Sequence, residues 1–175
     1  MGNDVTEQKR LGTTMQVLAW IVLMALLAAW FNDLLGRRHN PNQILETRYA
    51  EDGVREVVLQ RNRFGHYVTS GRINDEPVVF MLDTGATGVA IPENIARRLK
   101  LERGRAFRTQ TANGVAVSYA TRLDRVSVGD IALDNVSAGI VPGLQTSEIL
   151  LGMSFLKHIE FTQRGDQLIL RQYPG

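Results

Sequence analysis

The sequence contains no cysteine. Disulfide bonds, thiolate metal sites and cysteine nucleophiles are therefore excluded together. The absence says little about the compartment, because a chain without cysteine is compatible with either side of a membrane. Histidine is scarce as well: His39, His66 and His158 are scattered, without the spacing of metal ligands. We therefore expect no metal site and no cofactor.

An excess of one charge is also missing. The 175 residues include 20 Lys and Arg against 18 Asp and Glu. Basic residues gather between positions 97 and 108, but without the interleaved aromatic residues typical of nucleic-acid binding. We interpret this cluster as a solvated helix and loop face and expect no nucleic-acid partner. A glycine-rich phosphate loop and a serine nucleophile elbow are missing too.

One long stretch lacks charge altogether. The 22 residues from Leu11 to Asn32 would form a helix roughly 33 Å long, close to the hydrocarbon thickness of a bilayer. Trp30 lies near its end, where interfacial aromatic residues are favoured. We predict a transmembrane anchor over residues 11–35, after a head of residues 1–10. A cleaved signal peptide is the alternative, although its apolar core would usually be shorter, about 7–15 residues.

The charges that flank this segment do not decide its orientation. Lys9 and Arg10 precede it, and Arg37 and Arg38 follow it, so the positive-inside count is close to a tie. Residues 36–43, "GRRHNPNQ", are predicted to form a short polar linker.

From residue 44 onward the pattern is one of short strands separated by turn residues, with one or two brief helices. A helix is predicted over 92–100, where a proline occupies the expected first helical position, and a second at 153–158. Strands are predicted at 54–61, 66–73, 77–82, 131–133, 136–141 and 148–152, in two runs around Asn113-Gly114, and in a final pair around 164–166. The domain is therefore expected to be mostly β, a small barrel or sandwich.

The stretch "VVFMLDTGATGVAIP", Val78 to Pro92, places the acid Asp83 at the end of an apolar strand. Gly85 allows a tight turn and lets its N–H approach the carboxylate, and the Thr84 hydroxyl can hold the turn. A carboxylate on such a rigid turn suits the activation of a water molecule that attacks a peptide carbonyl.

That reaction needs two carboxylates, one ionised and one protonated, which share a proton because they cannot both ionise at about 3 Å. The sequence contains no second Asp-Thr-Gly or Asp-Ser-Gly. We therefore predict that the second acid is Asp83 of another copy of the chain, brought to the axis of a twofold homodimer.

The segments "MLDTGAT" (81–87) and "EILLGMSFL" (148–156) resemble, in identity and order, motifs of the retroviral-type, or retropepsin-like, aspartic proteases. The chain is similar in particular to a bacterial branch with an N-terminal membrane anchor and one protease domain. The resemblance implies a small closed β-barrel over residues 44–175, endopeptidase activity on a protein or peptide substrate, and a homodimer. It also implies a single-pass protein of the bacterial inner membrane with the protease domain in the periplasm.

The resemblance assigns roles to individual residues. Asp83 would be the catalytic acid, and its loop would be supported by Thr84, Gly85, Ala86 and Thr87. A bracing segment behind this loop would comprise Leu150, Leu151 and Gly152. The flap over the substrate would comprise Thr111, Ala112, Asn113, Gly114 and Val115, although its tip is not glycine-rich as in the viral enzymes. The C-terminal stretch "QLILRQY" (167–173) is a candidate dimerisation strand.

Two other interpretations of the Asp-Thr-Gly turn are weighed against the protease. Phosphoryl-transfer loops also begin with Asp after a strand, but they need a lysine and further acids on alternating α/β elements, which this pattern lacks. The alternative function that remains is a non-catalytic, membrane-tethered peptide-binding or dimerisation module of the same fold. The enzyme is favoured because such a module needs no acid at the end of an apolar strand.

Overall fold

The computed structural model describes residues 3–111 and 114–174, and it divides the chain into two units, residues 1–38 and 39–175. The first unit is the helix α1 (Asn3–His39), whose last residue belongs to the second unit. Its part from Thr14 to His39 reaches a mean hydropathy of 2.0, so by length and composition it could cross a membrane.

The helix α1 includes residues 36–39, which the sequence suggested as the start of a linker. Its last turns are supported by an ion pair one turn apart, in which Arg37 Nε donates to Asp33 Oδ2 at 2.9 Å. The chain leaves the helix only at Asn40, one residue before Pro41.

The second unit is mostly β, as predicted. Its helices are α2 (Glu93–Arg98) and α3 (Met153–Leu156), with a 3₁₀ turn η1 (Glu51–Gly53). Its strands are β1 (Thr47–Tyr49), β2 (Arg55–Gln60), β3 (Val68–Ile73), β4 (Glu76–Leu82), β5 (Val89–Pro92), β6 (Ala106–Thr111), β7 (Gly114–Val128), β8 (Ile131–Val141), β9 (Ile149–Leu151), β10 (Glu160–Arg164) and β11 (Gln167–Gln172).

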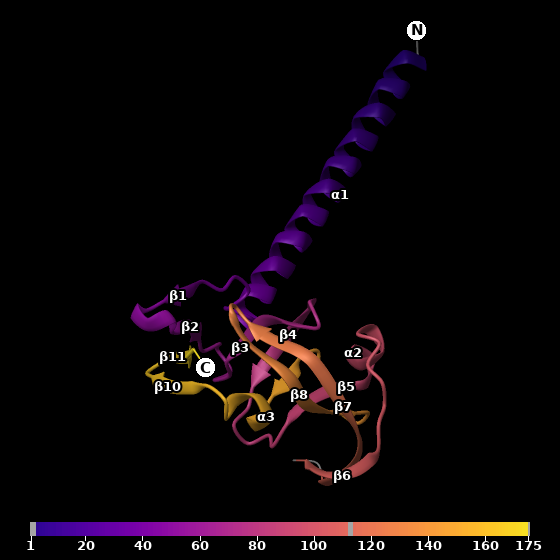
Figure 1. Cartoon of the computed structure of the whole chain (residues 1–175). Coiled ribbons are helices and arrows are strands. Elements are labelled where there is room, and N and C mark those ends of the chain that lie inside the picture. Colours follow the sequence, from indigo (N-terminus) through magenta and orange to yellow (C-terminus); the bar gives the residue numbers. More distant parts are fainter. Residues whose placement is uncertain (1–2, 112–113, 175) are drawn as a thin grey trace. The chain divides into compact units, whose positions relative to one another are not determined.

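The larger sheet has the strand order β3-β4-β9-β5-β8-β7-β6. An additional pairing of β3 with β7, through Arg72↔Ser127 and Ile73↔Val126, joins its two sides, so that six strands form a closed ring to which β6 is attached. The long strands β7 and β8 run side by side in this ring (Figure 1). Fully buried side chains, including Phe80 and Leu123, fill it.

The smaller sheet has the order β1-β2-β11-β10. Strand β11 pairs with β2 along one edge and with β10 along the other, both within the same chain. Both edges of β11 are therefore occupied within the chain, so in this structure it offers no free edge for pairing with a strand of a second copy. The part of residues 167–173 in a dimer stays a prediction. The register of strand partners is set by contacts far apart in sequence, which the local pattern did not reveal.

Candidate active site

The turn that carries Asp83 begins directly where β4 ends. Strand β4 runs parallel to β9, and this ladder continues beyond the strand because the Asp83 N–H donates to the Leu151 carbonyl at 3.2 Å. The Asp83 side chain accepts a hydrogen bond from the Gly85 N–H at 2.8 Å, and the Asp83 carbonyl accepts one from the Ala86 N–H at 3.2 Å. These bonds fix the backbone of the turn and the direction of the carboxylate.

The carboxylate of Asp83 is only partly covered. Asp83 is half-buried, whereas Thr84, Gly85 and Thr87 are exposed. Among the described residues, the Gly85 N–H is the sole hydrogen-bond donor to this side chain. An ionised carboxylate has about four acceptor positions. The turn therefore presents an acid with unused acceptor capacity to whatever faces it.

The segment predicted to brace this loop lies beside it. Strand β9 is inserted between β4 and β5, where Leu150 is the partner of Ala90. A Cβ on Gly152 would lie less than 3.0 Å from the carbonyl oxygens of Ala86 and Gly88, so only glycine fits there. The structure thus brings Leu150, Leu151 and Gly152 to the Asp83 turn; their part in catalysis stays a prediction.

A serine that the sequence pattern did not single out also holds the loop. Ser154, in α3, accepts a hydrogen bond from the Val89 N–H at 3.0 Å and donates one to the Ser137 carbonyl at 2.9 Å. The end of the loop is thereby tied to both α3 and β8. Its signal in the sequence is weak, because a serine in a short helix is common at the surface.

The comparison with known proteins agrees with this geometry. A sequence model of the family described as "gag-polyprotein putative aspartyl protease" matches residues 69–158, just over half of the chain and including the whole Asp83 turn. The chain belongs to this aspartyl protease family.

Two relatives of this chain come from bacteria. An uncharacterized protein in the cobV 5′ region of Sinorhizobium sp. is 33% identical over 124 residues, which cover 69% of this chain and 53% of the relative. The uncharacterized protein RP867 of Rickettsia prowazekii (strain Madrid E) is 28% identical over 124 residues, covering 69% of this chain and 52% of that protein. The chain therefore spans about half the length of these curated relatives.

A solved structure shows the fold of the family. The crystal structure of a retropepsin-like aspartic protease from Rickettsia conorii matches this chain with a TM-score of 0.56 and 26% identity, covering 74% of this chain and 95% of that one. The predicted retropepsin-like fold, mostly β with few helices, is confirmed.

In this family member a second acid lies one strand away from the Asp83 turn. Glu148 immediately precedes β9, and it is 6% exposed. Its Oε1 accepts a hydrogen bond from Ser147 Oγ at 2.7 Å and is in contact with Nε2 of His39, the last residue of α1. Burial by itself raises the pKa of Glu148, but the hydrogen bonds from Ser147 and His39 and the charge of His39 outweigh it, so the pKa lies below its ordinary value.

Four buried polar residues lie next to the exposed His39, and we call the five together the α1 junction (His39, Asn40, Asn42, Asn62 and Glu148). Asn42 Oδ1 accepts from the Gln60 N–H at 2.7 Å, and its Nδ2 donates to the carbonyls of Gln60 and Val68 at 2.9 and 2.7 Å. From the sequence, His39 is an isolated histidine and residues 40–43 are part of a linker, and nothing in the local pattern pointed to these contacts.

The predicted flap is the hairpin of β6 and β7. Ala112 and Asn113 lie outside the described residues, and Thr111 pairs with Gly114 in the ladder. The Phe107 ring of β6 lies against Gly139 of β8, and within the hairpin Thr109 Oγ1 donates to Ser118 Oγ at 2.9 Å. Val115 lies exposed in β7, so its side chain is available for contact; its role as a flap residue stays a prediction.

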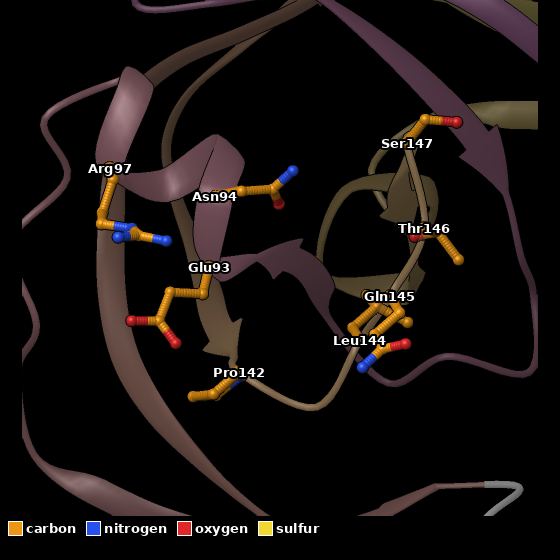
Figure 2. Close-up of a pocket in the computed structure, with 8 residues that line it drawn as sticks. All are labelled: Glu93, Asn94, Arg97, Pro142, Leu144, Gln145, Thr146 and Ser147. Atoms are coloured by element: carbon orange, nitrogen blue, oxygen red, sulfur yellow. The ribbon is translucent and has the colours of Figure 1, made fainter.

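An open groove of about 490 Å³ lies away from Asp83, between α2 and the loop that joins β8 to β9. Figure 2 shows Glu93, Asn94 and Arg97 on one side of the groove, Pro142 below Glu93, and Leu144, Gln145, Thr146 and Ser147 on the other side. Glu93 is also paired with Arg103. The residues that line this groove include none of the Asp83 turn.

Proposed function

We propose that the chain is a membrane-anchored aspartic endopeptidase, active as a homodimer in which Asp83 and Asp83 of a second copy activate one water molecule. The observation that carries the proposal is the geometry of the Asp83 turn. Its carboxylate accepts one hydrogen bond, from the Gly85 N–H, and the neighbouring Thr84 and Gly85 are exposed. The chain contains one Asp-Thr-Gly, so the second acid has to come from another copy. The membership in an aspartyl protease family and the match to a Rickettsia conorii retropepsin-like aspartic protease support it.

The proposed mechanism follows from the chemistry of the acid pair. One carboxylate is ionised and takes a proton from the water as it attacks the peptide carbonyl, while the other is protonated and donates to the carbonyl oxygen. The Gly85 N–H keeps the Asp83 carboxylate oriented, and the exposed Thr84 lies where a second copy of the turn can approach. The exposed Val115 on the hairpin would contact an extended peptide.

The direct test is cleavage of a denatured protein by the full chain in lipid nanodiscs. Asp83→Asn should abolish cleavage without changing the circular dichroism spectrum, because it removes the base and keeps the shape. Asp124→Asn is the matched control, since Asp124 is exposed and distant in sequence from the turn. Full activity of Asp83→Asn would overturn the proposal. A wild type that binds peptides without cleaving them would instead favour the peptide-binding module.

The homodimer has a separate test. When equal amounts of wild-type and Asp83→Asn chains are mixed in detergent before reconstitution, random pairing leaves about one quarter of the dimers with two acids. Activity per total protein should then fall to about a quarter of the wild-type value, whereas an active monomer would give a half. Thr84→Ala should weaken the dimer and shift the activity toward higher protein density in the membrane.

We place the anchor in α1, with the protease domain on the periplasmic side of a bacterial inner membrane. The length and hydropathy of Thr14–His39 support the anchor, and the family resemblance supports the side. A reporter fused after Gly175 that is active only in the periplasm tests this topology; activity of a cytoplasmic reporter would reverse it.

A further inference from the structure

The turn between β2 and β3, Arg61–Tyr67, is fixed to the residue at which α1 ends. The side chain of Asn62 is buried, and its Nδ2 donates to the His39 carbonyl at 2.9 Å. Its Oδ1 accepts the N–H groups of Phe64 and His66, each at 3.0 Å. One asparagine therefore sets both the shape of the turn and its position beside His39.

This turn and the nearby chain expose apolar and basic side chains together. Phe64 is 56% exposed, and the guanidinium of Arg63 lies 4.5 Å from the centre of its ring. Ile44, five residues after His39, is 91% exposed, more than any other large apolar side chain among the described residues. Single exposed apolar residues are ordinary on soluble domains, but an aromatic ring, a bare aliphatic chain and arginine together are typical of membrane interfaces.

The charges of the region favour an anionic partner. Arg61 is paired with Asp166, and Arg37 with Asp33, so these two arginines are neutralised. Arg38 and Arg63 remain as the positive groups closest in sequence to His39 and Phe64. Phosphate groups at a lipid surface attract basic residues at this distance from a span.

Chain connectivity alone keeps the turn near the bilayer surface if α1 crosses it. The uncharged run ends at Asn32, and His39 follows seven residues later, about 10 Å along a helix. The headgroup layer on each side of the hydrocarbon is roughly 5–8 Å thick. Groups that are bonded to His39 therefore start at the outer edge of the headgroups, whatever the angle between helix and domain.

We propose that the Arg61–Tyr67 turn, together with Ile44, is a second membrane contact of the protease domain. Phe64 and Ile44 enter the headgroup layer of the bilayer that holds α1, and Arg63 pairs with lipid phosphate. The proposal rests on the anchoring of α1 that belongs to the proposed function. Its consequence is a domain held at two points, so that all copies in one membrane present their Asp83 turns at the same height.

The absence of cysteine permits a direct test with single labels on the full chain in nanodiscs of anionic lipid. A nitroxide is attached at His66→Cys and, as the control, at Tyr173→Cys. Tyr173 is 57% exposed and follows Gln172, the partner of Arg55 at the opposite end of β2, roughly 17 Å from the turn. The ratio of accessibility to oxygen over accessibility to an aqueous nickel chelate should be several-fold higher at His66 than at Tyr173.

Removal of the apolar side chains sharpens the test. In the double variant Phe64→Ser, Ile44→Ser, the accessibility ratio measured at position 66 should fall to the value measured at position 173. In the control variant Tyr173→Ser, the ratio measured at position 66 should not change. Circular dichroism checks that the double variant is folded. Arg63→Gln provides a milder second variant, and it should lower the His66 ratio more in anionic than in zwitterionic lipid, because both carry phosphate but only the anionic surface has a net negative charge. Equal ratios at His66 and Tyr173 in the unaltered chain would overturn the proposal.

Two further outcomes separate this proposal from its competitors. If the shielding of His66 is absent in discs that hold one chain and grows with the number of chains, the partner is a second copy and the lipid contact is wrong. A label at Leu26→Cys in α1 reports on the anchor independently. A shielded Leu26 with an exposed His66 overturns only the second contact, whereas exposure of both overturns the anchor as well.

Discussion

The Asp83 turn and the α1 junction hold their carboxylates in opposite ways, although β9 connects them. Asp83 lies half-buried with one hydrogen bond from the described residues, and the turn around it is exposed. Glu148 lies buried, three residues before the Leu151 carbonyl that binds Asp83, and both a serine and a histidine contact it. One acid keeps acceptor positions unused, and the other has its partners in place.

This difference separates a chemical role from a structural one. A buried carboxylate is tolerable only when it is paired, so the partners of Glu148 explain why it is there. The pairing of Glu148 leaves it poorly suited to a reaction, whereas Asp83 has room for a water molecule and a second acid. If this distinction holds, the geometry of the Asp83 turn depends on the close contacts behind it, and the stability of the α1 junction depends on its hydrogen bonds.

The largest effect is expected from Gly152→Ala. The new Cβ would lie less than 3.0 Å from the backbone oxygens of Ala86 and Gly88, which cannot move without distorting the Asp83 turn. We expect the free energy of unfolding to fall by about 3 kcal/mol or more, with loss of any cleavage activity. Hydrogen exchange of the domain measures this; tryptophan fluorescence does not, because Trp20 and Trp30 both lie in α1.

Gly143→Ala is the matched control for that variant. No atom lies within 4 Å of a Cβ placed on Gly143, and we expect a change within about 0.5 kcal/mol. Equal stability of the two variants would show that the turn is not held by close packing against residue 152.

The next largest effect is expected at the buried junction, from Asn42→Ala. The amide of Asn42 makes three hydrogen bonds to the backbone of Gln60 and Val68, and its loss leaves one N–H and two carbonyls with fewer partners. We expect the free energy of unfolding to fall by about 2–3 kcal/mol, with early exchange of amides in β2 and β3. Asn94→Ala, at an exposed position of α2, should change it by less than about 0.5 kcal/mol. A similar small change in both variants would contradict a structural role of the junction.

These two sites differ in how well the sequence predicted them. The Asp83 turn was located because its signals are local: an apolar run, an acid, and a glycine two residues later. The contact of His39 with Glu148 joins positions 109 residues apart, and Asn42 binds the ends of two strands. Polar contacts of this kind follow no period in the sequence, so they emerge only once the strands are placed.

The strands themselves illustrate the same limit. The apolar pattern predicted β4, β9 and β11 close to their observed bounds, and Pro92 marked the start of α2. It did not reveal that β11 is enclosed between β2 and β10, because the partner of a strand is set by the whole fold.

A smaller effect, now at the exposed site, is expected from Ser154→Ala. The Val89 N–H loses its acceptor and the Ser137 carbonyl loses a donor, so the end of the Asp83 loop is held less firmly. We expect a decrease of about 1–2 kcal/mol in the free energy of unfolding, and a lower kcat with little change in KM. Ser137→Ala is the control, since it removes an exposed hydroxyl and keeps the carbonyl that Ser154 binds. An unchanged kcat in a stably folded Ser154→Ala would contradict a positioning role.

The smallest effect, and the one that depends on pH, is expected from Glu148→Gln. The pKa of Glu148 lies below its ordinary value of 4.5 in the folded chain, so its charge stabilises the fold at pH values above the unfolded pKa. That contribution is lost as the pH falls through the folded pKa. Near neutral pH, Glu148→Gln should lower the free energy of unfolding by about 1 kcal/mol, because a charge-assisted hydrogen bond becomes a neutral one.

The pH dependence distinguishes the charge of Glu148 from its shape. The difference between wild type and Glu148→Gln, measured by denaturation followed by far-UV circular dichroism, should shrink toward zero in strongly acidic solution. Glu102→Gln, at an exposed position, should show no such change. A difference that stays constant with pH would mean that Glu148 is held by packing alone, and one that grows in acid would reverse the sign of its pKa shift. Either result would remove the contrast with Asp83, because the charge of Glu148 would then not stabilise the folded chain.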